Sequence, residues 1–160
     1  MEREQFLEVY RHSLAHILAK AVIELYGKEV QYAIGPQIAD GFYYDFTFPE
    51  GVAVTTEDFP KIEEKMHEII KRREDWKREE ISKADAAKMF ASQKFKTEII
   101  NDLADDETIT IYYTGTDYVD LCRGPHVDNS QELMGAAFEI RSVSGAYWRG
   151  DENRDRLIRI

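Results

Sequence analysis

The chain has 160 residues, of which 43% are hydrophobic, 12% aromatic and 32% charged, and its net charge is −10. This composition can bury a core, which excludes wholesale disorder, and the length favours a single domain. Apolar runs fall far short of the roughly 18–20 residues of a spanning helix, and no secretory signal is visible, so we expect no membrane association. The lone Cys122 cannot form an internal disulfide, and it favours a reducing, cytoplasmic location.

The acidic balance argues against autonomous, tight binding of nucleic acid, because phosphate contacts require a basic face. Residues 71–78 carry the one dense basic stretch, and acidic residues at 74–75 and 79–80 interrupt it. We interpret this stretch as a solvated helix face. Presentation of a nucleic-acid end by another domain remains compatible with the charge.

The N-terminal segment, residues 4–26, predicts a long helix that ends at Gly27. Its apolar stripe contains Leu7, Leu14, Leu18, Ala21, Val22 and Leu25. His12 and His16 are four residues apart and share the roughly opposite side, where their neighbours are small or apolar. We therefore expect the helix to be covered on both sides, with two imidazoles facing a second enclosed space.

The next segments alternate between strands and helices. Residues 30–48 predict strands interrupted by glycine turns, residues 57–73 a second helix, and residues 79–81 a short strand. A capping-box-like start at Ser82 predicts a short helix through Phe90, and another is expected over 95–103. We place His67, in the second helix, on the surface.

The C-terminal part has β character. We expect strands at 108–114 and 118–122, a loop at 123–126, a hairpin of 137–143 with 146–148 around Ser144-Gly145, and a last strand at 157–160. These elements predict one α+β domain, with a long N-terminal helix and further helices packed on a largely antiparallel sheet.

Two short motifs carry the candidate chemistry: His12-x-x-x-His16 on a helix and Cys122-x-x-x-His126 in a loop. The four side chains could bind Zn²⁺ tetrahedrally, or form a metal-free hydrolytic pocket in which imidazoles exchange protons. Taken singly, a histidine pair four residues apart is commonly part of a helix surface, and a lone cysteine is usually a small core residue. Their joint occurrence favours a functional site.

Five sequence blocks resemble the second N-terminal domain of bacterial-type threonyl-tRNA synthetases, in the same order and over essentially the whole chain. They are His12-Ser-Leu-Ala-His16, Ala33-Ile-Gly-Pro36, Gly41-Phe-Tyr-Tyr-Asp45, Tyr118-Val-Asp-Leu-Cys-Arg-Gly-Pro-His126 and Gly145-Ala-Tyr-Trp-Arg-Gly-Asp151. Related alanyl-tRNA editing domains usually have Cys-x-Gly-Thr-His, so Pro125 favours the threonyl type.

The resemblance implies an editing domain, residues 1–160, which hydrolyses the ester of mischarged seryl-tRNA(Thr) and cannot aminoacylate by itself. It implies catalytic roles for His12, Lys96, Asp120, Cys122 and His126. It also implies substrate contacts for His16, Asp120 and His126. Lys96 rests on a weaker local match, with Lys94 as the alternative. The implied partners are the 3′ end of seryl-tRNA(Thr) and the remaining domains of a larger synthetase, from which this chain is expected to be an excised fragment.

Spacing and resemblance disagree about metal. The set His12, His16, Cys122 and His126 alone favours zinc, whereas the threonyl-type resemblance implies that no cofactor is required, and we expect none. A closed four-ligand site would also leave no position for a catalytic water. Two alternatives stay open: a zinc-dependent alanyl-tRNA-type editing hydrolase, and a non-catalytic zinc or interaction module.

Overall fold

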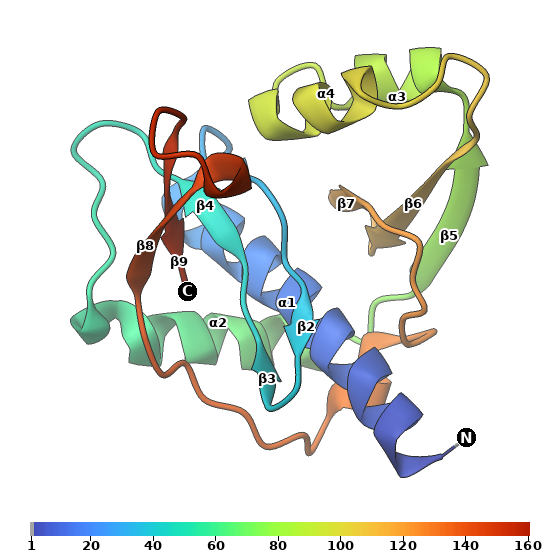
Figure 1. Ribbon diagram of the computed structural model, residues 1–160. Helices are drawn as coiled ribbons and strands as arrows, with labels where there is room; N and C mark the ends of the chain where they lie inside the picture. Colours follow the sequence, from blue (N-terminus) through green and yellow to red (C-terminus); the bar gives the residue numbers. More distant parts are fainter. Residues whose placement is uncertain (1) are drawn as a thin grey trace.

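The computed structural model describes residues 2–160, over which the chain forms four α-helices and nine strands. The first helix, α1 (Arg3–Tyr26), crosses the whole molecule diagonally (Figure 1). Every residue from Ser13 to Val22 is buried, so the expectation of a helix covered on both sides is confirmed. The apolar side packs on α2 (Phe59–Lys71), and the histidine side faces a separate layer of strands.

One layer contains a four-stranded antiparallel sheet in the order β1-β4-β9-β8. Its strands are short: β1 (Gln31–Tyr32), β4 (Asp45–Thr47), β8 (Ser144–Tyr147) and β9 (Arg156–Arg159). A two-stranded hairpin, β2 (Gln37–Ile38) and β3 (Gly41–Phe42), lies between β1 and β4 in the sequence. The main core lies between this layer and the two long helices, where Leu18, Phe46 and Ile62 are fully buried.

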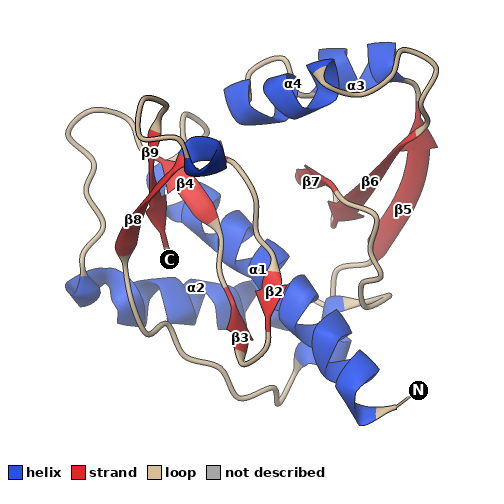
Figure 2. Ribbon diagram, viewed as in Figure 1, coloured by secondary structure: helices blue, strands red, loops and turns tan. Residues whose placement is uncertain are grey.

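The other layer is a three-stranded antiparallel sheet in the order β5-β6-β7. It consists of β5 (Trp76–Ile81), β6 (Ile109–Thr114) and β7 (Tyr118–Leu121), capped at one end by α3 (Lys83–Met89) and α4 (Lys94–Asn101) (Figure 2). Ser82 accepts a hydrogen bond from the Asp85 amide, as the cap prediction requires. A second core holds this layer together, with Phe90, Ile100 and Ile111 buried between helices and strands.

The predicted strand at 79–81 is too short, because β5 begins at Trp76. The helix before it ends at Lys71, so Lys77 and Arg78 lie on a strand and the interpretation of 71–78 as one helix face is wrong. Exposure explains the difference: β5 is an edge strand of its sheet, and Lys77 and Arg78 are both exposed after the buried Trp76, so the residues show no alternating pattern that predicts a strand.

The predicted hairpin of 137–143 with 146–148 is also wrong. Ser144 and Gly145 lie inside β8, which pairs with β9. A Cβ at Gly145 would lie 2.9 Å from the guanidinium of Arg156 in β9, a contact that this exposed and flexible side chain can relieve. Residues 137–143 instead run along α2, where the Ile140 amide donates to Glu63 and Phe138 stacks on the exposed His67.

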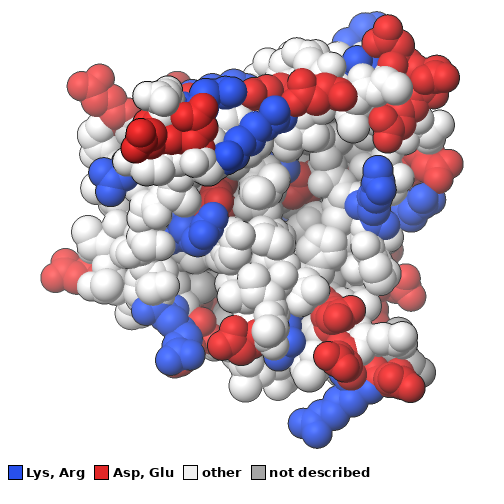
Figure 3. All heavy atoms as spheres, viewed as in Figure 1, with Lys and Arg blue, Asp and Glu red and all other residues white. Residues whose placement is uncertain are grey.

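The architecture is α+β, as predicted, although the antiparallel strands divide into three sheets. Among residues 2–160, no helix combines the length and the apolarity needed to cross a membrane. Acidic and basic side chains are interspersed around a mainly uncharged centre on the face shown in Figure 3.

Candidate functional site

The two motifs meet where α1 passes the end of β7. The potential ligand atoms of His12, His16, Cys122 and His126 all lie within 4.8 Å of one another. The helix supplies the first pair one turn apart, and the loop after β7 turns back so that Cys122 and His126 face them. The two pairs predicted from their spacing therefore form one cluster.

Cys122 is the hub of this cluster. Its Sγ lies 3.3 Å from Nε2 of His12 and 3.1 Å from Nε2 of His126, and it accepts a hydrogen bond from the Gly124 amide at 3.2 Å. Gly124 has φ +73°, and a Cβ there would collide with the Tyr112 ring. The loop conformation thus depends on glycine and holds the sulfur between the two imidazoles.

Lys96 and Asp120 form a buried ion pair beside the histidines. Lys96 Nζ lies 2.5 Å from Oδ1 of Asp120, and His16 Nε2 lies 3.6 Å from Oδ2 of the same carboxylate. Lys94 is exposed and pairs instead with Asp155 at the far side of α4. Of the two candidate lysines, the structure therefore brings Lys96 into the site.

Both members of this pair make further contacts with protein groups, although Oδ1 of Asp120 has no hydrogen-bond partner among residues 2–160 besides its ion pair with Lys96. Lys96 also donates to the Ala33 carbonyl at 2.7 Å and to the Tyr44 hydroxyl at 3.1 Å. Oδ2 of Asp120 accepts from the hydroxyls of Tyr44 at 2.5 Å and Tyr118 at 3.0 Å. These contacts hold the side chains of Lys96 and Asp120 in place. Either group must therefore give up one of these protein contacts to bind a substrate.

Aromatic rings form the walls around the imidazoles. The Trp76 ring lies 5.8 Å from His16 and 4.9 Å from His126, centroid to centroid, and its Nε1 donates to Ser130. Tyr112 meets His126 edge to face at 4.6 Å. This apolar enclosure removes water from around the two inner imidazoles.

Burial keeps the three histidines neutral. It lowers the pKa of His12, although Asp120 partly opposes this shift. It lowers the pKa of His16 far below the ordinary 6.5, with the neighbouring His12 adding to the effect. Burial, together with His16, also lowers the pKa of His126 strongly. At neutral pH each ring can therefore donate a hydrogen bond through one nitrogen and accept one through the other.

Burial acts on Cys122 in the opposite sense and raises the pKa of its thiol to about 12. At neutral pH the thiolate is then roughly one part in 10⁵, too little for a covalent nucleophile. The sulfur acts as a neutral group that shapes the site and donates its S–H weakly.

A cavity of about 410 Å³ opens next to the cluster, within the size range of small-molecule sites. It is lined by residues of three segments: Gln5, Glu8, Val9, His12, Gln37, Gly124 and Pro125. His12 is half-buried and provides the link between this space and the deeper residues. Of the four residues of the cluster, only His12 lines this cavity.

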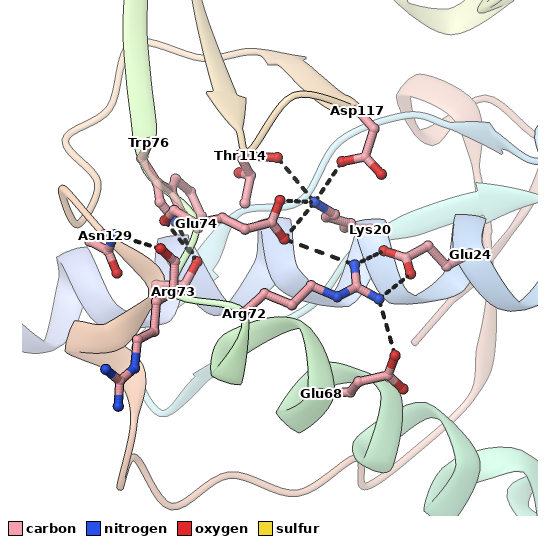
Figure 4. Close-up of polar contacts among 11 residues, drawn as sticks. Lys20, Glu24, Glu68, Arg72, Arg73, Glu74, Trp76, Thr114, Asp117 and Asn129 are labelled. Atoms are coloured by element: carbon pink, nitrogen blue, oxygen red, sulfur yellow. Dashed lines mark hydrogen bonds and ion pairs between the residues drawn. The ribbon is translucent and has the colours of Figure 1, made fainter.

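Below the site, a buried lysine joins the two layers (Figure 4). Lys20 follows His12 and His16 at the same four-residue interval along α1, and it is 2% exposed. Its Nζ donates to the Glu74 carboxylate at 2.9 Å, to the Thr114 carbonyl at 3.1 Å and to Asp117 at 2.8 Å. These contacts attach the start of β5 and the β6–β7 turn to α1, which sets the distance between the histidines and β7.

The four-residue cluster fits zinc in ligand type and number. His12, His16, Cys122 and His126 offer three imidazoles and one sulfur, and the two nitrogen–sulfur distances from Cys122 are close to those in a tetrahedral site. His16 Nδ1 is buried with no hydrogen-bond partner among residues 2–160, which leaves it available as a ligand. The donor set is thus compatible with a metal.

Several residues of the site were not predicted from the sequence. Tyr44 and Tyr118 lay inside the quoted sequence blocks, but nothing in the pattern linked them to Asp120. Ser13 lies between the two histidines of its motif, and its hydroxyl contacts His126. Trp76 lies within the basic stretch 71–78. Its burial could have been predicted only if residues 76–81 had been assigned to a strand.

Comparisons with known proteins identify the family that the chain resembles. Residues 109–160, which contain β6, β7 and the Cys122 loop, match the family model described as the threonyl and alanyl tRNA synthetase second additional domain. A threonine–tRNA ligase of Dehalococcoides mccartyi is 48% identical over 154 residues, covering 96% of this chain and 25% of that protein. The resemblance to this family is confirmed.

Other threonine–tRNA ligases match over the same extent. The protein of Thermotoga neapolitana is 48% identical over 161 residues, covering 100% of this chain and 24% of that protein. The protein of Aquifex aeolicus is 45% identical over 160 residues, covering 98% of this chain and 24% of that protein. The chain therefore spans about a quarter of the length of these threonine–tRNA ligases.

Proposed function

We propose that this chain is the editing domain of a threonyl-tRNA synthetase and hydrolyses the ester of mischarged seryl-tRNA(Thr). The observation that carries the proposal is the neutral His12 imidazole at the junction between a ligand-sized cavity and a buried polar cluster. The similarity to threonine–tRNA ligases over the whole chain supports the tRNA part of the substrate.

The need for such a reaction follows from the size of threonine. A pocket that accepts threonine cannot strongly reject serine, because one missing methyl group is worth only about 1–3 kcal/mol. A second, smaller site corrects the error by hydrolysing serine esters and excluding threonine by its extra methyl. In this proposal the cavity beside His12 receives the terminal adenosine and its aminoacyl group.

In the proposed reaction His12 is the general base. Its unprotonated nitrogen takes a proton from water as the water oxygen bonds to the ester carbonyl carbon, and the bond from that carbon to the ribose oxygen then breaks. The ribose oxygen takes up a proton, and serine and free tRNA leave. His126 donates a hydrogen bond to the carbonyl or ribose oxygen. Lys96 and Asp120 orient the aminoacyl group, and His16 holds the His12 ring in position from the buried side of the site.

The test is deacylation of seryl-tRNA(Thr) compared with threonyl-tRNA(Thr), using the chain as it stands and a complete threonyl-tRNA synthetase as the positive control. We expect faster release of serine than of threonine, even if the absolute rate is slow without the other domains. Equal rates for the two esters, with the control active, would refute the proposal.

We further propose that the reaction needs no metal, although the ligand set favours a second candidate, a zinc-dependent hydrolase of the alanyl-tRNA type. In that case His12, His16, Cys122 and His126 would hold the ion, which would supply an activated water. Elemental analysis of untagged protein, with deacylation measured before and after chelation, separates the two. Stoichiometric zinc, with activity lost on chelation and restored by zinc, would establish the second candidate. Activity on seryl-tRNA(Ala) would identify its substrate.

A non-catalytic zinc or interaction module is the third reading. It predicts no ester hydrolysis and no effect of His12→Ala on any reaction. The same deacylation assay decides against it if His12→Ala abolishes a measurable rate.

A further inference from the structure

Ser13 is a buried hydroxyl that the proposed reaction does not use. It lies on α1 between His12 and His16 and has no exposed surface. Its Oγ lies 3.0 Å from Nδ1 of His126 and accepts a hydrogen bond from the Val127 amide at 3.2 Å. The contact spans 113 positions of the sequence, and it joins α1 to the loop after β7.

The hydrogens on these groups can be assigned by counting donors. The Val127 amide is always a donor, so Ser13 Oγ accepts from it. The hydroxyl hydrogen of Ser13 then has one acceptor within hydrogen-bond distance among residues 2–160, which is Nδ1 of His126. The opposite arrangement, with Nδ1–H donating to Ser13, would leave a buried O–H with no partner and is unfavourable.

We infer that Ser13 is a positioning residue that fixes His126 as the Nε2–H tautomer, so that His126 serves the editing reaction as a hydrogen-bond donor. This inference rests on the proposed function for its catalytic consequence. Its structural part, the position of one proton, stands on the contacts of Ser13 alone.

The remaining contacts assign the hydrogens that link His126, Cys122 and His12 to one direction. Nε2–H of His126 points at Sγ of Cys122, a weak acceptor from which a substrate oxygen would have to take this donor, and Sγ also accepts from the Gly124 amide. The S–H of Cys122 is then directed to Nε2 of His12, whose ring also donates to the Pro125 carbonyl. The chain of donors thus ends on Nε2 of His12, whose lone pair accepts only the weak S–H donor and becomes available to a water when the thiol hydrogen turns away.

The assigned tautomer also bears on metal binding. A metal held through Nε2 of His126 needs the lone pair of that nitrogen, so the proton would have to move to Nδ1. Ser13 already directs its own hydrogen at Nδ1, so the move would reverse this hydrogen bond and leave the buried Ser13 O–H without a partner. Ser13 therefore favours the metal-free arrangement of this histidine.

Nitrogen-15 NMR of the histidine side chains tests the tautomer directly. In the wild-type chain at neutral pH we expect His126 to show a protonated Nε2 and an unprotonated Nδ1. A proton found on Nδ1 would overturn the inference, whether or not the chain hydrolyses seryl-tRNA(Thr). A wild-type chain with the expected tautomer and no hydrolysis would refute the proposed function and its catalytic consequence, while the structural assignment would stand.

Variants of Ser13 test the catalytic consequence. Ser13→Thr keeps the hydroxyl. Ser13→Val has nearly the shape of threonine but lacks the hydroxyl, and Ser13→Ala removes the hydroxyl without adding volume. We expect kcat for seryl-tRNA(Thr) to fall at least about tenfold in the Val and Ala variants, with KM little changed, because the donor is no longer oriented. Ser13→Thr should retain kcat within about threefold.

The NMR spectra of these variants provide the decisive comparison. Ser13→Ala should shift both ring nitrogens of His126, and Ser13→Thr should restore the wild-type pattern. Ser92→Ala, which removes an exposed serine, is the control for both measurements. Unchanged His126 nitrogens and unchanged kcat in Ser13→Ala would overturn the inference. If the variants fail to fold, the wild-type spectrum alone decides the tautomer.

Discussion

His12 and Lys96 occupy different positions in the site, and their substitutions should separate two kinds of damage. His12→Ala removes the base at the cavity wall, so seryl-tRNA(Thr) deacylation should fall at least about 100-fold. The free energy of unfolding should change little, because His12 is half-buried and its partners are neutral. A loss below tenfold in steady-state deacylation would mean that another group is the base.

Lys96→Met should reduce both activity and stability. It leaves the Asp120 carboxylate buried without its cation, which typically costs about 3–5 kcal/mol of unfolding free energy. Lys94→Met is the matched control two residues away, and its exposed position predicts wild-type stability and activity. Urea denaturation and deacylation rates of the two variants check this, and equal effects of both would contradict the placement of Lys96.

The depressed pKa values of the inner histidines predict acid lability. His16 and His126 stay unprotonated in the folded chain below the ordinary pKa of 6.5, while the unfolded chain takes up a proton at each. Stability is therefore complete above that pH and falls as the pH decreases below it. Two such groups give a slope of roughly 2.7 kcal/mol per pH unit.

Urea unfolding of metal-free protein between pH 6 and 5 measures this slope. His16→Asn should reduce it by about half, because one of the two groups is removed. His67→Asn, which changes an exposed histidine of α2, is the matched control variant. A wild-type slope near zero in this range would contradict the burial of the two imidazoles as neutral rings.

The layers on either side of α1 depend on Lys20 for their connection. Lys20→Met leaves the Glu74 carboxylate without its principal cation, and we expect a loss of about 3–5 kcal/mol in unfolding free energy. Because the β6–β7 turn is attached through the same ammonium group, hydrogen exchange should accelerate first in β6 and β7. Lys77→Met, in an exposed pair with Glu79, should have no measurable effect.

Elements with a clear periodic pattern were predictable, and contacts between distant segments were not. The helix α1 and the cap of α3 depend on residues within a few positions of one another, and both predictions are confirmed, although Leu7 of the predicted stripe is exposed. The hairpin around Ser144-Gly145 is wrong because the turn signal was local, whereas the true partner of β8 is β9. The Ser13–His126 contact has no local signature of any kind.

The candidate site was predictable in its membership more than in its geometry. Spacing singled out His12, His16, Cys122 and His126, because each pair is internal to one short motif. Lys96 and Asp120 entered through the family resemblance. Their mutual contact, and the two tyrosines that complete it, depend on how α4 and β7 pack, which no single-sequence pattern specifies.

The charge of the whole molecule predicts weak recognition of tRNA. With a net charge of −10, and basic side chains interspersed with acidic ones, the chain has no large phosphate-binding face in the view of Figure 3. We expect full-length tRNA to bind no tighter than micromolar at physiological salt, mainly through its terminal CCA and amino acid. Fluorescence anisotropy with a short aminoacyl-CCA analogue as competitor checks this, and submicromolar affinity for uncharged tRNA would contradict it.

The regular interval of His12, His16 and Lys20 along α1 limits how this helix can change in length. A residue inserted between His16 and Lys20 would rotate one part of the helix relative to the other by roughly 100°. The histidines could then face β7 only if Lys20 turned away from Glu74 and Thr114. The number of residues in this stretch is therefore fixed, and its composition is restricted to side chains that fit the buried core. Insertions and deletions are instead expected in the connection between β4 and α2, where no strand pairing depends on length.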